Sequence, residues 1–247
     1  MKIAIIGCGN MGMTYAHTFI RYKVIDSNNL LLVEKNTLRK NQLAASKNWQ
    51  VTDIIDKKIG QNDVVILAVK PQDFNSVALP LKKSLRPGCI LLSIMAGVTI
   101  SSLEKKLNHK SIIRAMPNLP TQVGMGVTGF AASRSTTLAQ IRKTENLLNT
   151  TGKTVFFEDE SHLDAVTALS GSGPAYFFYF VKSLVDAGEA MGLEKPTATM
   201  LVNQTMLGSF HIFNSSTKSL DELIASVSSK GGTTEADFKK LSKNKIN

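Results

Sequence analysis

The chain has few of the residues that build disulfide frameworks, metal sites or membrane spans. Its two cysteines, Cys8 and Cys89, stand alone without a CxxC pair, so we predict neither a disulfide framework nor a zinc site. No apolar run approaches the roughly 20 residues of a membrane span. The opening MKIAII reaches Gly7 too soon to contain a signal-peptide core. We therefore expect a soluble, cytoplasmic protein with no membrane partner and no metal.

Basic residues outnumber acidic ones and give a formal net charge of +10. Such a charge suggests nucleic acid as a partner. However, the lysines are scattered, and their densest group, KKLSKNK at 239–245, has no interleaved aromatic residues. We therefore expect no nucleic acid and predict a small anionic molecule as the ligand.

Short apolar runs alternate with helical patterns over the first part of the chain. Strands are expected at 3–6, 30–33, 63–69, 89–94, 111–116, 127–132 and 154–157, and helices at 10–22, 37–47, 72–85, 99–107 and 136–149. Apolar strands separated by helices form a mostly parallel sheet that is buried on both faces. Residues 1–158 are therefore predicted to form one α/β domain.

The strand pattern ends near residue 159, and only helices are expected beyond it. They are predicted at 174–191, 196–214, 219–226 and 234–243, with Pro174 and Pro196 in first turns. The first two are apolar around much of their circumference, and so short a segment cannot bury all that surface alone. We expect residues 159–247 to be an all-α dimerisation domain of an intertwined homodimer.

A GxGxxG sequence lies between the first predicted strand and the first predicted helix. Gly7 permits a tight turn, Gly9 lets a pyrophosphate approach the backbone, and Gly12 allows close packing of the helix on the strand. The free N–H groups at the helix start suit phosphate. This pattern predicts a Rossmann-type dinucleotide-binding domain. Its expected phosphate loop consists of Gly7, Cys8, Gly9, Asn10, Met11 and Gly12.

The residues after the second strand leave the choice between NADH and NADPH open. Glu34 stands where an acidic side chain would bond the ribose 2′-hydroxyl and favour NADH. Lys35, Arg39 and Lys40 follow closely and could neutralise a 2′-phosphate.

Two glycine-rich segments, LSGSGPAY at 169–176 and SSKGGTT at 228–234, are candidates for a second, anion-binding site. A helix that starts at Pro174 would leave N–H groups free at Ser172 and Gly173. Successive glycines in the other segment can form an anion-binding nest; its candidate residues are Gly231, Gly232, Thr233 and Thr234. A nucleophilic Ser172 is the alternative, but the sequence places no activating base beside it.

The chain is poor in residues for acid–base chemistry. His17, His109, His162 and His211 stand singly along the sequence. Hydride transfer to a ketone usually requires a positioned acid or base. An imine nitrogen can already carry the proton, so reduction then depends mainly on orientation and proximity. The sequence therefore favours an imine substrate.

Six motifs together resemble the pyrroline-5-carboxylate reductases. They are AVKPQ (68–72), SIMAGVTI (93–100), RAMPNLPTQVGMG (114–126), LSGSGPAY (169–176), GEAMGL (188–193) and SSKGGTT (228–234). The resemblance spans nearly the whole chain and implies reduction of 1-pyrroline-5-carboxylate to L-proline by NADPH or NADH, the last step of proline biosynthesis. It also implies a helical domain that interlocks two subunits.

The same resemblance assigns further site residues. It implies cofactor contacts at Ala68, Val69, Lys70, Pro71, Met95, Ala96, Gly97 and Asn118, in addition to the phosphate loop, Glu34 and Lys35. It implies an acidic position near the substrate at Glu160. The loop from Ser229 to Thr234 would grip the substrate carboxylate, with Thr234 near the imine nitrogen.

Four departures from the family pattern are visible. Lys230 replaces a proline, Leu119 replaces a threonine, and Ile55 replaces an asparagine on the adenosine side. The chain ends at Asn247, about one helix before the family pattern does, so a dimer is expected and not a decamer. Two alternatives therefore stay open: a reductase of another cyclic imino acid, and a paralogue that binds nucleotide without catalysis.

Overall fold

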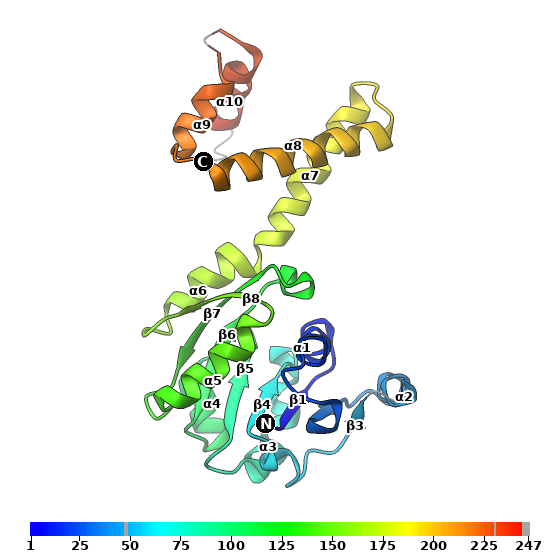
Figure 1. Cartoon of the computed structure of the whole chain (residues 1–247), viewed down its shortest axis with the longest axis vertical. Coiled ribbons are helices and arrows are strands. Elements are labelled where there is room, and N and C mark those ends of the chain that lie inside the picture. Colours follow the sequence, from blue (N-terminus) through cyan, green and yellow to red (C-terminus); the bar gives the residue numbers. More distant parts are fainter. Residues whose placement is uncertain (47–48, 230, 244–247) are drawn as a thin grey trace. The chain divides into compact units, whose positions relative to one another are not determined.

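The structure is a computed structural model that describes residues 1–46, 49–229 and 231–243. The chain divides into two compact units, Met1–Tyr176 and Phe177–Asn247 (Figure 1). The division between the units falls after Tyr176, whereas the sequence predicts a domain boundary after residue 158. That boundary remains a prediction. Among the described residues, no helix is long and apolar enough to cross a bilayer.

The first unit is built on an eight-stranded sheet with the order β3-β2-β1-β4-β5-β6-β7-β8. Neighbouring strands are parallel, apart from the antiparallel pair β6 and β7. The strands are β1 (Ile3–Ile6), β2 (Leu30–Val33), β3 (Gln50–Thr52), β4 (Val64–Leu67), β5 (Ile90–Ser93), β6 (Ile112–Met116), β7 (Gly126–Ala132) and β8 (Gly152–Phe156). The predicted α/β fold with a mostly parallel sheet is confirmed.

Helices cover both faces of this sheet because strands such as β1 and β4 are apolar and buried at every position. In β1, Ile3 and Ile5 pack on one face, whereas Ala4 and Ile6 pack on the other. The first face carries α1 (Asn10–Arg21), α2 (Thr37–Ala45) and α5 (Leu138–Asn149). The second face carries α3 (Phe74–Ser84), α4 (Ile100–Leu107) and α6 (His162–Val166).

Strand β3 and the helical segment before Pro174 were not expected from the sequence. Strand β3 is a polar edge strand beside β2. The segment before Pro174 is helical, because α6 continues through a π-helical turn, Thr167–Gly171, toward α7 (Gly173–Ala190). Leu163 of α6 is fully buried against the sheet. This contact holds α6 within the first unit.

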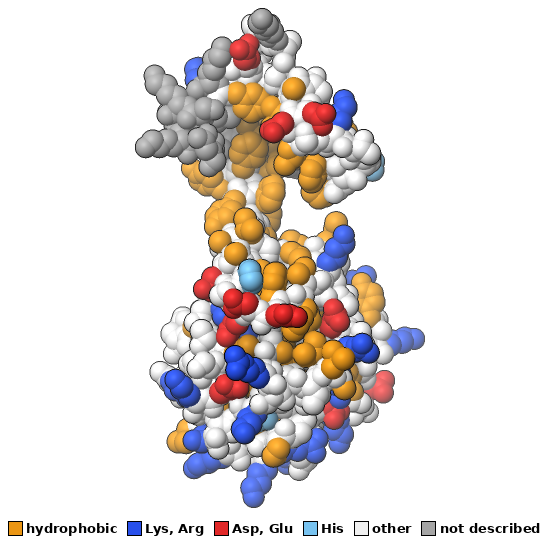
Figure 2. Space-filling model, turned by 90° about the vertical axis from the view of Figure 1, so that its left-hand side faces the viewer, with side chains coloured by type: hydrophobic (Ala, Val, Ile, Leu, Met, Phe, Trp, Pro, Cys, Tyr) orange, Lys and Arg blue, Asp and Glu red, His pale blue; other side chains and the backbone are white. Residues whose placement is uncertain are grey.

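The second unit holds the rest of α7 and three more helices: α8 (Lys195–Ser215), α9 (Leu220–Val227) and α10 (Thr233–Lys243). Gly188 lets α7 and α8 approach, since a Cβ there would lie 3.0 Å from the Cβ of Ala198. Many large apolar side chains remain exposed on this unit, as Figure 2 shows. They include Phe177, Phe178, Tyr179, Phe180, Met200, Leu207, Phe210, Leu220 and Val227. The prediction that these helices cannot bury their own apolar surface is confirmed.

His109 is expected to make the first unit less stable in acid. It is 5% exposed, and its Nε2 lies 2.8 Å from the Cys89 carbonyl oxygen. Burial lowers the pKa of His109 below its ordinary value of 6.5. The unfolded chain therefore binds a proton that the folded chain resists, and stability is lost as the pH falls below that value. Urea unfolding at pH 7.5 and 5.5 should show a smaller pH effect in His109→Gln than in the unchanged chain; an equal effect would contradict this.

Candidate functional site

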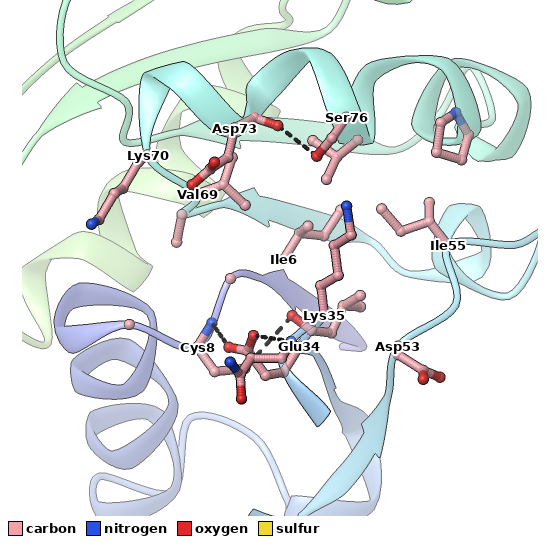
Figure 3. Close-up of a pocket in the computed structure, with 17 residues that line it drawn as sticks. Ile6, Cys8, Glu34, Lys35, Asp53, Ile55, Val69, Lys70, Asp73 and Ser76 are labelled. Atoms are coloured by element: carbon pink, nitrogen blue, oxygen red, sulfur yellow. Dashed lines mark hydrogen bonds between the residues drawn. The ribbon is translucent and has the colours of Figure 1, made fainter. Parts of the chain in front are cut away.

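A cavity of about 590 Å³ opens at the carboxyl ends of β1, β2 and β4, where ligands bind in doubly wound sheets (Figure 3). The turn after β1, the end of β2 and the end of β4 form its walls, together with α3. Among the predicted cofactor residues, its lining contains Gly7, Cys8, Gly9, Glu34, Lys35, Ala68, Val69 and Lys70. The structure thus brings together residues from three separate motifs.

The turn after β1 has the geometry that a phosphate loop requires. Gly7 has φ +98°, and a Cβ there would lie 2.7 Å from the Ala68 carbonyl oxygen. A Cβ on Gly12 would lie 2.1 Å from the Gly7 carbonyl oxygen, so α1 can pass close to β1 only with glycine there. Gly9 lines the cavity, and a Cβ on it would meet no protein atom within 4 Å. The fold therefore requires Gly7 and Gly12, whereas Gly9 leaves room for a ligand.

Helix α1 begins at Asn10, with Gly9 as N-cap and no side-chain hydrogen bond that caps its first N–H groups. The first N–H groups of a helix have no partner within it and carry partial positive charge. Asn10 and Met11 therefore present backbone donors beside Gly9. A backbone that can be approached, free donors and a neighbouring cavity fit the pyrophosphate of a dinucleotide.

Cys8 is a structural residue in this loop. Its side chain is 1% exposed, and its Sγ lies 3.7 Å from the Val33 carbonyl oxygen. Burial, and after it the Glu34 carboxylate, raises the pKa of the Cys8 thiol to about 12. A thiol that holds its proton so tightly is not a nucleophile.

The charged residues after β2 are held in different ways. Glu34 accepts hydrogen bonds from the backbone N–H groups of Cys8 at 3.2 Å and Asn36 at 2.8 Å (Figure 3). Lys40 is paired with Asp53 at 2.7 Å. Lys35 lines the cavity. Ile55 also lines it, at the place where the family pattern has an asparagine.

The predicted residues after β5 and β6 lie outside the cavity lining. Met95 is 2% exposed and packs in the core with α3 and α4, so its side chain supports the loop. Ala96 and Gly97 are exposed, and Gly97 has φ +71°. Asn118 accepts a hydrogen bond from the Val127 N–H at 3.0 Å and so connects the end of β6 to β7. Pro71 begins the short 3₁₀ helix Pro71–Asp73 ahead of α3.

Glu160 has structural contacts that the sequence did not reveal. Its Oε1 accepts hydrogen bonds from the Ile100 N–H at 2.8 Å and from Nη1 of Arg114 at 2.9 Å. Nη2 of Arg114 lies 3.5 Å from Asp164. Arg114 is 4% exposed, and the signal for it was a lone arginine in the apolar run SIIRAM. Contact of Glu160 with substrate remains a prediction.

The prediction of a free backbone N–H group at Ser172 is wrong. The Ser172 N–H donates to the Thr167 carbonyl oxygen at 2.9 Å, because the π-helical turn already winds the chain before α7. Gly173 has open space where a Cβ would stand. The helix therefore does not start with an exposed cap at Ser172, and a role for either residue in binding substrate stays a prediction.

The loop before α10 is also more internally bonded than predicted. The Gly232 N–H donates to the Ser229 carbonyl oxygen at 2.9 Å, and the Gly231 N–H donates to Oε2 of Glu235 at 2.6 Å. The prediction of an open, anion-binding nest at these two glycines is therefore wrong. Thr233 and Thr234 stand in the first turn of α10, where backbone N–H groups have no partner within the helix. Lys230 lies outside the described residues.

Comparison with known proteins gives the family. Residues 160–247 match the family model of pyrroline-5-carboxylate reductase dimerisation. Residues 2–97 match that of NADP oxidoreductase, coenzyme F420-dependent. The pyrroline-5-carboxylate reductase of Pseudomonas aeruginosa is 35% identical over 98% of this chain and 89% of its own length. That of Aquifex aeolicus is 36% identical over the same shares.

Solved structures agree with the sequence relatives. The Plasmodium falciparum pyrroline carboxylate reductase, solved with NADP bound, has a TM-score of 0.87 and 29% identity, covering 100% of this chain and 91% of that one. The Streptococcus pyogenes 1-pyrroline-5-carboxylate reductase has a TM-score of 0.89 and 28% identity, covering 100% and 92%. With its phosphate loop, its cavity and its full-length relatives, this chain belongs to the pyrroline-5-carboxylate reductase family.

Proposed function

We propose that this protein reduces 1-pyrroline-5-carboxylate to L-proline with NADH or NADPH. The observation that carries the proposal is the cavity that Gly7 and Gly9 line at the carboxyl ends of β1, β2 and β4, in a chain that matches pyrroline-5-carboxylate reductases over 98% of its length. When bound, the cofactor supplies the hydride that adds to the imine carbon. The imine nitrogen carries the added proton and becomes the ring amine of proline.

The substrate-side residues have the task of holding a cyclic imino acid in place. Thr233 and Thr234 offer backbone N–H groups and hydroxyls at the start of α10, which suit a carboxylate. Thr234 and Ser229 are our candidates for the hydroxyls nearest the imine nitrogen. Glu160 and the Ser172–Gly173 segment are our further candidates for contact with the substrate.

We propose a homodimer as the active form, with the helical regions of two copies interlocked. The exposed aromatic side chains of α7 and α8 support it, since monomers rarely expose so much apolar surface. The match of residues 160–247 to a dimerisation family supports it further. The partner copy would then help to complete each substrate site.

Turnover tests the function. Purified protein mixed with 1-pyrroline-5-carboxylate should consume NADH or NADPH, followed at 340 nm, and should form L-proline. The six-membered imine 1-piperideine-2-carboxylate is the comparison substrate; faster turnover with it would favour another imino acid. A nucleotide-dependent rise in Tm without turnover of either imine would favour the non-catalytic paralogue.

Thr234→Val is expected to lower kcat/KM for the imine at least about tenfold, because one hydrogen-bonding hydroxyl is lost. The Kd of the nucleotide should stay unchanged. Thr217→Val, at an exposed position between α8 and α9, is the matched control. Equal kcat/KM in the two variants would remove Thr234 from the site.

A further inference from the structure

The carboxylate of Glu34 is fixed in place at the end of β2. Two backbone N–H groups from separate segments hold it: Cys8 in the phosphate loop bonds Oε2, and Asn36 at the entrance of α2 bonds Oε1. Asn36 is itself held as the N-cap of α2, where its side chain accepts the Arg39 N–H at 2.9 Å. Turning Glu34 away would leave both donors without their bonds.

This fixed carboxylate borders the cavity where an adenosine ribose lies in proteins of this fold. A ribose 2′-hydroxyl can donate a hydrogen bond to it. A 2′-phosphate would instead meet a like charge, and like charges in contact weaken binding. Glu34 thus attracts the ribose 2′-hydroxyl of NADH and repels the 2′-phosphate of NADPH.

The surrounding charges do not offset Glu34, although the chain as a whole is basic. The charged residues of the cavity lining are three carboxylates and two ammonium groups, namely Glu34, Asp53, Asp73, Lys35 and Lys70. Lys40 is already paired with Asp53 at 2.7 Å. Arg39 is the other nearby cation, and its charge acts on the Cys8 thiol against that of Glu34.

We infer that this enzyme prefers NADH to NADPH, and that Glu34 sets the preference. The inference rests on the proposed function only in taking a nicotinamide dinucleotide as the occupant of the cavity. It does not depend on which imine is reduced. The three carboxylates of the lining outnumber its two ammonium groups, which therefore do not reverse the effect of Glu34.

The test measures binding without substrate. Calorimetric titration of the full-length protein with NADH and with NADPH should give a Kd at least about tenfold lower for NADH. Glu34→Ser should remove that preference by weakening NADH and strengthening NADPH. Glu34→Gln keeps the size and one acceptor oxygen, and should lose preference through the charge alone. Glu145→Gln, on α5 and outside the cavity lining, is the matched control and should behave as the unchanged protein.

The Kd values of the unchanged protein and of the two Glu34 variants decide whether the inference holds. Equal or tighter binding of NADPH by the unchanged protein would overturn the inference, as would an unaltered Kd ratio in both folded Glu34 variants. If one variant does not fold, the other and the unchanged protein still decide it. NADH preference without turnover of 1-pyrroline-5-carboxylate would uphold the inference while the proposed function fails. No binding of either nucleotide would overturn both.

Discussion

Gly12→Ala is expected to lose nucleotide binding, with Kd raised about 100-fold or more, and to be less stable by about 1–3 kcal/mol. The added Cβ would lie 2.1 Å from the Gly7 carbonyl oxygen, which is backbone and not the end of a flexible side chain. Gly7 cannot easily retreat, because it has φ +98° and stands against Ala68. The phosphate loop must therefore deform. Calorimetric titration and urea unfolding measure the two effects.

Gly9→Ala is the matched control for this prediction. Its Cβ would meet no protein atom within 4 Å, so the stability should change by less than about 1 kcal/mol, the usual cost of alanine at an N-cap. The Cβ would project where the pyrophosphate is expected, so Kd should still rise. Wild-type affinity in Gly12→Ala, or equal instability in both variants, would contradict the assignment of the two glycines.

Arg114→Met is expected to lower the free energy of unfolding by about 3 kcal/mol, the low end for breaking a buried ion pair. The guanidinium is 4% exposed and bonds Glu160 at 2.9 Å, while Asp164 lies 3.5 Å away. Removing the guanidinium leaves the partly buried carboxylate of Glu160 without its cation, which destabilises the folded state. We use the low end because the Glu160 side chain is 24% exposed.

Urea unfolding of Arg114→Met, Glu160→Gln and the double variant measures this coupling. The sum of the two single losses in the free energy of unfolding should exceed the loss in the double variant, because each substitution removes the same contact. Arg142→Met, on the exposed side of α5, is the matched control. Losses that simply add would show that Arg114 and Glu160 do not stabilise the fold through each other.

Apolar runs bounded by turn residues allowed most of the sheet to be predicted. Runs such as IAII and LLLV match β1 and β2 because central strands of a parallel sheet are buried on both faces. Strand β3 was not predicted because it is a short, polar edge strand that pairs only with β2 and therefore has no apolar run. The π-helical turn escaped because nothing in the residues before Pro174 distinguishes a cap from a continued helix.

The cofactor half of the candidate site could be predicted better than the substrate half. Glycine positions follow from local backbone sterics, so GxGxxG specifies its turn by itself. By contrast, the Gly231 N–H is bonded to Glu235 and Glu160 is bonded to Arg114. Such side-chain partners depend on how the chain packs, which spacing along the sequence does not reveal.

The position of β1 in the sheet has a consequence for biosynthesis. Ile3 lies between Leu30 of β2 and Val64 of β4, so β1, which is translated before both neighbours, becomes an interior strand of the sheet. Its second neighbour is translated only after β2, α2 and β3. Pairings between residues so far apart in sequence form slowly, since the loop must close before the contact forms. We therefore expect the backbone N–H and C=O groups along one edge of β1 to stay unpaired in a nascent chain until Val64–Leu67 emerges.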